Sequence, residues 1–468
     1  MTYRLLIDGE LIDTEHHLDV VNPATGKVFA TCPRATGDHL EQAVSAAKRA
    51  QRDWRNSDVS QRRQALRQLA SRIVEQREQM AEVLTREQGK TLDFARFEID
   101  ATVQFINHFA EQALPESRVL EDSDAQRVEL HRKPLGVVAC VTPWNFPLLQ
   151  AAYKMAPAVL TGNAVIIKPS PTTPLTTLLF GELLKDLFPA GLVNVITGNN
   201  DLGPALTVHP DIDKLSLTGS TATGKAVMAA ASHTLKPLTL ELGGNDAAIL
   251  LDDVNLDSAL PAVFATAFIN SGQVCIAIKR LYVPDSLYDE VCARLAEMAD
   301  AAVIGDGLDP ASEYGPLQNR AQLDKFHHYL DTAKRDGNVI TQTSAPAGEG
   351  YFAPFTIVRD IAEGTPLVDE EPFCPILPVL RYSSVDEAVA RANNTTLGLG
   401  GSVWSSDPKR AAEVAGKLEC GTAWVNQHCG FGPHIPFGGI KQSGLGVEFG
   451  EEGLEAFTTI QILSVAKG

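Results

Sequence analysis

Two polar side chains lie in apolar or glycine-rich surroundings from which they could act on a carbonyl group. Asn145 lies in Pro143–Pro147, directly after the apolar run Val137–Val141, and prolines on both sides restrict its backbone. Its side-chain amide could donate to a developing oxyanion. Glu241 lies in Leu240–Asn245, where burial would raise a carboxyl pKa into the range of a general base. Each also fits a structural role, as a turn asparagine or as a salt-bridged carboxylate.

Cys275 is the candidate nucleophile, because it follows Gly272 and precedes two cations, Lys279 and Arg280. If the segment enters a helix, the local positive field stabilises the thiolate, which is the reactive form. The alternative is a small buried apolar residue. Seven cysteines without a Cys-x-x-Cys pair predict no zinc cluster, no other metal and no disulfide framework. They favour a location in the reducing cytoplasm.

Two glycine-rich segments allow close backbone approach. Gly219–Gly224 followed by Lys225 has P-loop spacing, but Ala226 stands where a P-loop needs Ser or Thr to hold magnesium. The fingerprint G-x-G-x-x-G is absent. The first segment therefore binds a dinucleotide phosphate at a helix N-terminus or is a turn needed for packing. The second, Pro436–Gly446, approaches either a ligand or a neighbouring domain.

The elements that must position these residues alternate between strand and helix. Short strands and turns are expected over the first ~30 residues, and helices follow, including one near Phe97 to Gln112. From Pro134, short β-branched runs alternate with helical stretches, which predicts a parallel sheet, and a second alternation runs from about Asp253 to Asn426. A terminal strand is expected at Thr458 to Val465.

Composition excludes several classes of protein. The chain has 468 residues, which suggests about three domains. Its net charge of −18 argues against nucleic acid and anionic membrane surfaces as partners. No signal peptide is recognisable, and no apolar run is long enough for a transmembrane helix.

Together, these segments resemble the aldehyde dehydrogenase superfamily. They occur in the family's order over almost the whole chain. The matching stretches are Pro143–Pro147, Ile167–Ser170, Gly219–Gly224, Glu241–Gly244, Gly272–Cys275, Glu371–Phe373 and Pro436–Gly446.

The resemblance implies an NAD(P)-dependent enzyme that oxidises an aldehyde to a carboxylic acid through a cysteine thioester. Cys275 would be the nucleophile, Asn145 and the Cys275 N–H the oxyanion hole, and Glu241 the base that activates water. Two alternatives remain. A CoA-acylating dehydrogenase generally lacks the carboxylate found at Glu241, and a non-catalytic protein that kept the fold would not need the three residues.

The resemblance also implies a cofactor site. Lys168 and Glu371 would hold the two riboses, with Phe373 at the nicotinamide end and Cys374 where the family usually has glycine. Pro171 replaces a glutamate common in NAD-preferring members, but no arginine adjoins it to attract a 2′-phosphate, so NAD is favoured over NADP. The expected cofactor-binding residues are Trp144, Lys168, Ser170, Gly219, Ser220, Gly224, Leu242, Glu371 and Phe373.

The expected substrate tunnel is apolar and aromatic, with Ile276 as one wall. It predicts an uncharged, medium-sized aldehyde, aromatic ones included, and Cys429 is not expected to be a second nucleophile. The expected substrate-binding residues are Phe146, Gln150, Tyr153, Ile269, Ile276, His428, Cys429 and Phe431.

The implied architecture is α/β, with a Rossmann-like cofactor domain, an α/β catalytic domain and a small β oligomerisation element. The expected boundaries are 1–114 and 134–241 for the cofactor domain, 242–445 for the catalytic domain, and 115–133 and 446–468 for the oligomerisation element. A homodimer or homotetramer is expected, because exposed strand edges need a partner subunit.

Overall fold

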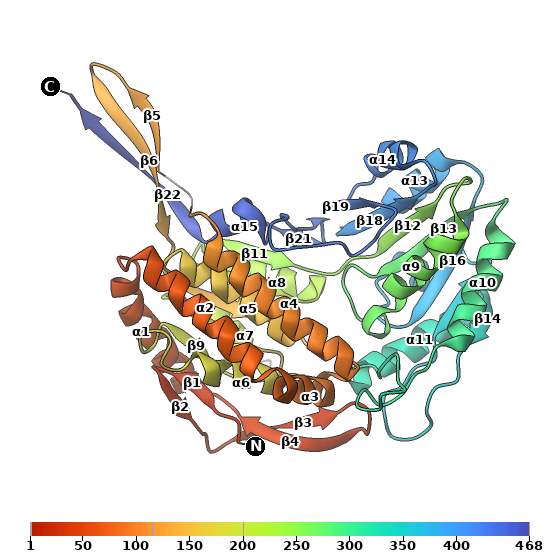
Figure 1. The fold of residues 1–468 in the computed structure, drawn as a ribbon, viewed down its shortest axis with the longest axis horizontal. Helices are drawn as coiled ribbons and strands as arrows, with labels where there is room; N and C mark the ends of the chain where they lie inside the picture. The colour runs from red at the N-terminus through yellow and green to blue at the C-terminus, as the bar shows by residue number, and fades with distance from the viewer. Residues whose placement is uncertain (1, 115–116, 200, 468) are drawn as a thin grey trace.

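Two large α/β units lie side by side, and a narrow three-stranded sheet projects from one of them (Figure 1). The structure, a computed structural model, describes residues 2–114, 117–199 and 201–467. The expected boundary at Pro115 lies outside these residues. Within them, no helix combines the length and apolar character needed to cross a membrane.

The first unit is built on an eight-stranded sheet with a parallel centre. Strands β9, β8, β7, β10 and β11 are parallel, whereas β1, β2 and β21 are antiparallel additions at the edges. In spatial order the strands are β2 (Glu10–Ile12), β1 (Leu5–Ile7), β9 (Val193–Val195), β8 (Ala164–Lys168), β7 (Val137–Val141), β10 (Lys214–Thr218), β11 (Leu238–Glu241) and β21 (Gly444–Leu445).

Chain order reverses between β7 and β10, as in a doubly wound Rossmann-like fold, and such a switch point opens a crevice beyond the carboxyl ends of the strands. Helices pack around this sheet, because its central strands are buried on both faces. These helices are α1 (Gly37–Trp54), α2 (Val59–Glu75), α3 (Arg77–Gln88), α4 (Leu92–Glu111), α5 (Pro147–Leu160), α6 (Leu175–Leu184), α7 (Leu202–Val208) and α8 (Thr221–Ala231).

The second unit has a seven-stranded sheet, parallel except for β14, with an apolar core on each face. In spatial order its strands are β14 (Asn338–Gln342), β15 (Thr356–Arg359), β16 (Ile376–Tyr382), β13 (Ile278–Pro284), β12 (Asp246–Leu250), β18 (Gly400–Trp404) and β19 (Thr422–Val425). Its helices are α9 (Leu256–Phe268), the 3-10 turn η1 (Ile269–Gly272), α10 (Tyr288–Ala301), α11 (Arg320–Asp336), α12 (Pro366–Asp369), α13 (Val385–Asn393) and α14 (Pro408–Ala415).

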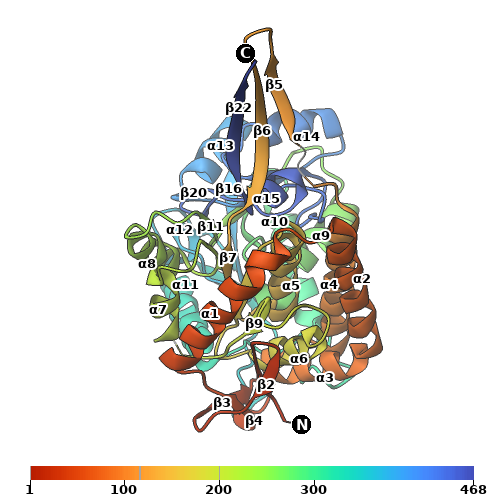
Figure 2. The same cartoon turned by 90° about the vertical axis from the view of Figure 1, so that its left-hand side faces the viewer.

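The projecting sheet is antiparallel, and Figure 2 shows it extending away from both units. It joins β5 (Arg118–Asp122) and β6 (Gln126–Pro134) to the C-terminal strand β22 (Thr458–Ala466), which follows the short helix α15 (Gly450–Glu455). Two small hairpin-like pairs complete the fold: β3 (His17–Asn22) with β4 (Lys27–Pro33), and β17 (Leu397–Gly398) with β20 (Ile440–Lys441).

Candidate active site

The crevice at the switch point of the first sheet carries two of the predicted segments. Pro143–Asn145 follows β7, and Gly219 and Ser220 follow β10. Ser220 is the N-cap of α8, and its Oγ accepts from the Thr223 N–H at 3.2 Å. A Cβ on Gly224 would come within 2.5 Å of the Leu242 side chain, so this glycine serves close helix packing.

Cys275 lies in a turn that leads into strand β13, so the condition for a thiolate stabilised at a helix entry is not met. Asn270, Ser271 and Gly272 precede it with φ values of 50°, 55° and 76°. A left-handed backbone costs a non-glycine residue roughly 1–2 kcal/mol. The Ser271 hydroxyl, which donates to the Gly315 carbonyl at 2.7 Å, helps to hold this strained turn.

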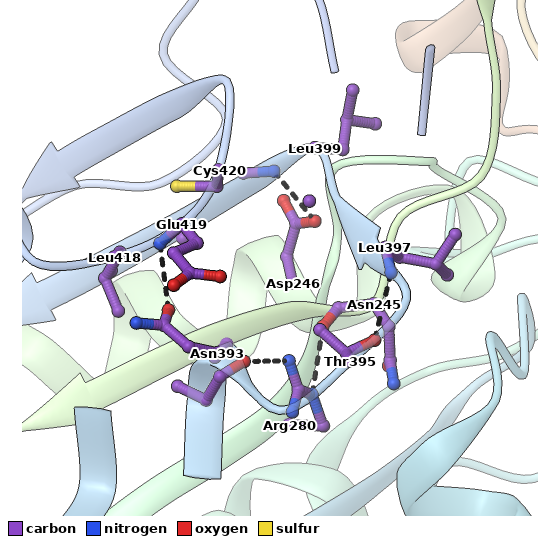
Figure 3. Close-up of a pocket in the computed structure, with 15 residues that line it drawn as sticks. Asn245, Asp246, Arg280, Asn393, Thr395, Leu397, Leu399, Leu418, Glu419 and Cys420 are labelled. Carbon is purple, nitrogen blue, oxygen red and sulfur yellow. Dashed lines mark hydrogen bonds between the residues drawn. The ribbon is translucent and has the colours of Figure 1, made fainter. Parts of the chain in front are cut away.

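The local positive field expected around the thiol is also largely absent. Burial raises the pKa of Cys275 to about 12, and only Lys279 opposes this rise among the groups that act on it. Arg280 points to the other side of β13, where its guanidinium donates to the carbonyls of Asn245 and Ala392 (Figure 3). Successive residues of a strand face opposite sides of the sheet, so the adjacent Lys279 and Arg280 cannot both face the thiol.

Asn145 is 4% exposed and lies beside the nucleophile turn. Its Nδ2 donates to the Gln273 carbonyl at 3.0 Å, which ties the end of β7 to the turn that carries Cys275. Within the described part of the chain, Nδ2 has this one acceptor and therefore keeps a second hydrogen for a ligand. Asn145 and Cys275 line the same cavity, so one carbonyl oxygen could meet both.

Glu241, at the end of β11, is buried, and neither carboxyl oxygen has a hydrogen-bond partner among the described residues. Burial, followed by the negative charge of Glu448, raises its pKa well above the usual value, whereas Lys154 lowers it. Lys154 Nζ donates to Glu448 at 2.6 Å and to Ser216 at 3.0 Å. The neutral form of Glu241 is thus favoured more than that of an exposed carboxyl group. Glu241 lines neither of the two cavities that Cys275 lines.

The first of these cavities, the cofactor cleft, has a volume of about 150 Å³. Glu371 accepts the Gly244 N–H at 3.1 Å, and the Phe373 and Trp144 rings meet edge to face at 5.4 Å. The lining residues are Pro143, Trp144, Asn145, Thr218, Gly219, Ser220, Leu242, Gly243, Cys275, Gln322, Lys325, Glu371 and Phe373.

The cleft suits a dinucleotide, because it combines a helix N-terminus, aromatic rings and unpaired polar atoms. Within the described residues, Thr218 Oγ1 and Gln322 Oε1 are buried without partners. Of the expected cofactor residues, Lys168, Ser170 and Gly224 lie outside the lining, although Lys168 ends the adjacent strand β8. Gln322 and Lys325 come from α11, which carries no sequence signal for a ligand.

The second cavity, the aromatic cavity, has a similar volume of about 150 Å³ and shares only Cys275 with the lining of the first. It contains every expected substrate residue except His428. Sequence reasoning missed Phe94 and Phe97, which reach it from α4, because a helix gives no sign of which remote surface it will cover. The lining residues are Phe94, Phe97, Phe146, Leu149, Gln150, Tyr153, Ile269, Val274, Cys275, Ile276, Cys429, Phe431, Phe437 and Phe449.

His428 lies behind this cavity rather than in its lining. Its Nε2 donates to the Ile276 carbonyl at 2.8 Å and its Nδ1 accepts from the Ser402 hydroxyl at 2.9 Å. The neighbouring Cys429 thiol donates to the same Ile276 carbonyl at 2.9 Å. Burial raises the pKa of Cys429 well above its usual value, which disfavours a second thiolate.

A separate polar cavity of about 20 Å³ lies beside the beginning of β12 and of β18, between Arg280, Asp246 and Cys420 (Figure 3). This volume is about that of one water molecule. Cys275, Asn145 and Glu241 are not in its lining, so it is not part of the candidate active site.

Comparison with known proteins identifies the family. Residues 11–463 match the sequence profile described as the Aldehyde dehydrogenase family. The chain belongs to this family. The aldehyde dehydrogenase is 36% identical to human mitochondrial aldehyde dehydrogenase over 455 residues, covering 95% of this chain and 88% of the human protein. It is also 36% identical to phenylacetaldehyde dehydrogenase of Pseudomonas fluorescens over 487 residues, covering 100% and 96% of the two chains.

A solved structure shares the fold. The aldehyde dehydrogenase superposes on betaine aldehyde dehydrogenase from Staphylococcus aureus, in complex with NAD+, with a TM-score of 0.96 at 32% identity, covering 100% of this chain and 95% of that one. The mixed α/β fold and the NAD(P)-dependent oxidation of an aldehyde therefore hold for this enzyme.

Proposed function

We propose that the enzyme oxidises uncharged, medium-sized aldehydes, aromatic ones included, to carboxylic acids with NAD+ through a thioester on Cys275. The observation that carries the proposal is that Cys275 lines both the cofactor cleft and the aromatic cavity. A thiol at this junction can meet an aldehyde from one side and a nicotinamide from the other.

In the proposed reaction, the Cys275 thiolate bonds to the aldehyde carbon and forms an oxyanion, which Asn145 Nδ2 and the Cys275 N–H stabilise. NAD+ held in the cofactor cleft would supply the hydride acceptor, and loss of hydride from that carbon leaves a thioester on Cys275. The Glu241 carboxylate takes a proton from water, the resulting hydroxide adds to the thioester, and Cys275 leaves as thiolate. Glu241 must first lose its own proton, which Lys154 favours.

The aromatic cavity supports an uncharged substrate. None of its lining residues is Asp, Glu, Lys or Arg, so an aldehyde with a terminal carboxylate or phosphate would lose hydration without finding a counter-charge. The name of the relative from Pseudomonas fluorescens, phenylacetaldehyde dehydrogenase, supports an arylalkyl aldehyde.

NAD+ is the proposed cofactor. Pro171 brings neither a carboxylate for the adenosine ribose hydroxyls nor a cation for a 2′-phosphate, so the sequence gives only a modest preference. The NAD+ bound by the Staphylococcus aureus relative supports this preference.

A panel of aldehydes assayed with NAD+ and NADP+ separately, with and without CoA, tests these proposals. Phenylacetaldehyde or a similar aldehyde should be oxidised with a higher kcat/KM than a carboxylate-terminated semialdehyde, and more efficiently with NAD+. A strong preference for the semialdehyde would refute the substrate class. Accumulation of acyl-CoA would replace hydrolysis by CoA acylation, and cofactor binding without turnover of any aldehyde would favour a non-catalytic role.

We also propose that residues 115–133 and 446–468 form an oligomerisation element of a cytoplasmic homodimer or homotetramer. In the same proposal, residues 1–114 and 134–241 form the cofactor domain, and residues 242–445 form the catalytic domain. The exposed apolar side chains on β22 support the first part, because a strand edge with such residues needs cover. They are Ile460, Ile462, Leu463 and Val465. Deletion of 459–468 should yield monomers in sedimentation analysis, whereas an unchanged oligomer would exclude this role.

A further inference from the structure

Every backbone carbonyl of the turn Val274–Ala277 is held by a buried side chain. Lys279 Nζ donates to the carbonyls of Val274 and Cys275 at 2.8 Å each and to that of Ala277 at 3.2 Å. The remaining carbonyl, of Ile276, accepts from His428 at 2.8 Å. The nucleophile turn is thus restrained by cross-links from side chains.

Lys279 is an unusual residue for this position, because it is 3% exposed on a strand whose other residues are buried. Burial of an ammonium group costs several kcal/mol unless its three hydrogens find acceptors. All three find carbonyls of one turn. An apolar residue would pack in the strand without that cost, so the ammonium group itself points to a role.

The hydrogen bond from Lys279 to the Val274 carbonyl, together with one from the Ala277 N–H at 3.0 Å, sets the direction of a second group. In a trans peptide the N–H points away from the C=O of the same peptide bond. The Val274 carbonyl and the Cys275 N–H belong to one peptide bond, so a carbonyl drawn toward Lys279 turns that N–H away from Lys279. This N–H is the proposed second donor of the oxyanion hole.

Lys279 also bears on the charge of the thiol. Lys279 lowers the pKa of Cys275, whereas Glu371, Asp246 and Glu241 raise it. The other titratable neighbours, Tyr153 and Cys429, are neutral groups whose own pKa values burial raises. Lys279 Nζ lies 3.8 Å from Glu371 Oε1, so it also offsets part of the carboxylate charge at the cofactor cleft.

We propose that Lys279 is a positioning residue, which orients the Cys275 N–H toward the oxyanion and places a positive charge at the nucleophile turn. The proposal rests on the proposed role of Cys275 as nucleophile. It assigns to one buried lysine both the geometry and the charge of the nucleophile turn.

Two variants separate these effects. Lys279→Met removes donors and charge at similar volume, whereas Lys279→Gln removes the charge but keeps N–H donors. The matched control is Lys236→Met, because Lys236 is also buried and donates to a carbonyl, that of His209 at 2.7 Å, away from Cys275.

Two readouts are needed. The first is the rate at which iodoacetamide alkylates Cys275 in cofactor-free enzyme at one fixed pH, followed by mass spectrometry of the Cys275 peptide. The second is the burst of NADH in a single turnover, with the KM for NAD+ as a check on cofactor binding. Below the thiol pKa, a rise of one pKa unit lowers the thiolate fraction, and with it the alkylation rate, about tenfold.

Lys279→Met should slow alkylation and the burst by about tenfold or more, with little change in the KM for NAD+. Lys279→Gln should alkylate as slowly as the Met variant but retain a faster burst, and Lys236→Met should match the wild type. A wild-type rate in either readout for Lys279→Met overturns the proposal. If that variant does not fold, Lys279→Gln takes its place, and a wild-type rate of alkylation in Lys279→Gln overturns the proposal. Cys275→Ala separates the proposal for Lys279 from the proposed function, because a burst of NADH in that variant would refute the role of Cys275 as nucleophile.

Discussion

Replacement of Asn145 by alanine tests the oxyanion hole, because it removes one of the two proposed donors without altering the thiol. A single oxyanion donor contributes roughly 2.7–4 kcal/mol to the transition state, which corresponds to a fall in kcat of about 10²–10³-fold. The free hydrogen on Nδ2 and the shared cavity with Cys275 place this donor where such a contribution is expected.

The same substitution has a structural cost that must be separated from catalysis. Asn145→Ala removes the donor that holds the Gln273 carbonyl at 3.0 Å. The loss of a partner for a buried polar group destabilises a protein by about 1–3 kcal/mol. Asn163→Ala is the control, because Asn163 is also buried and its Nδ2 donates to the Phe457 carbonyl at 3.0 Å, as well as to the Ala158 carbonyl and the Thr161 hydroxyl, away from Cys275.

The assay is a stopped-flow measurement of the NADH burst at saturating aldehyde and NAD+, with thermal denaturation of both variants. Asn145→Ala should lose the burst rate by the stated factor, whereas Asn163→Ala should lose at least as much stability and keep its rate. A burst slowed by less than about tenfold in Asn145→Ala, at saturating substrates, would show that Asn145 does not bind the oxyanion.

Four further predictions follow from the same geometry. Glu241→Gln should keep the NADH burst but slow steady-state turnover by about 10²-fold or more. The variant should also lose the rise of turnover with pH that the wild type shows, because the raised pKa of Glu241 means that this group must lose a proton to act as a base. An unimpaired steady-state rate would remove Glu241 from the mechanism. Glu87 is fully buried with its pKa raised from 4.5 to about 7, so protonation of its carboxyl group favours the fold. The free energy of unfolding of the wild type should therefore fall by up to about 3 kcal/mol as pH rises between these values. In thermal melts across this pH range, Glu87→Gln should show a smaller fall, and an equal dependence of stability on pH in both proteins would contradict this prediction. Phe431→Arg supplies a cation at the aromatic cavity and should raise kcat/KM for a carboxylate-terminated aldehyde about tenfold, as one charge-assisted hydrogen bond would; no gain would mean that the substrate tail lies elsewhere. Pro171→Glu should increase the ratio of kcat/KM for NAD+ over NADP+, and an unchanged ratio would place the adenosine ribose away from Pro171.

The sequence alone determined the kinds of reactive group and, apart from the helix considered after Cys275, the elements that carry them. Strand-sized apolar runs buried on both faces require a parallel sheet with helical crossovers, and a doubly wound sheet forces Asn145 and Ser220 to one crevice. Glu241 in an apolar run implied a raised pKa, because burial penalises a carboxylate wherever it occurs. These inferences depend on local pattern and solvation, which the order of residues specifies directly.

Tertiary structure decided the surroundings of those groups. The turn that carries Cys275 leads into a strand, so Arg280 faces away from the thiol. Lys279 binds carbonyls of the turn rather than lying beside the thiol in a helix. His428 packs behind the aromatic cavity, whereas Phe94 lines this cavity from a helix about 180 residues before Cys275 in the chain. Side-chain direction in a turn, and contacts between segments remote in sequence, depend on how two α/β units pack together, and no local periodicity encodes that packing.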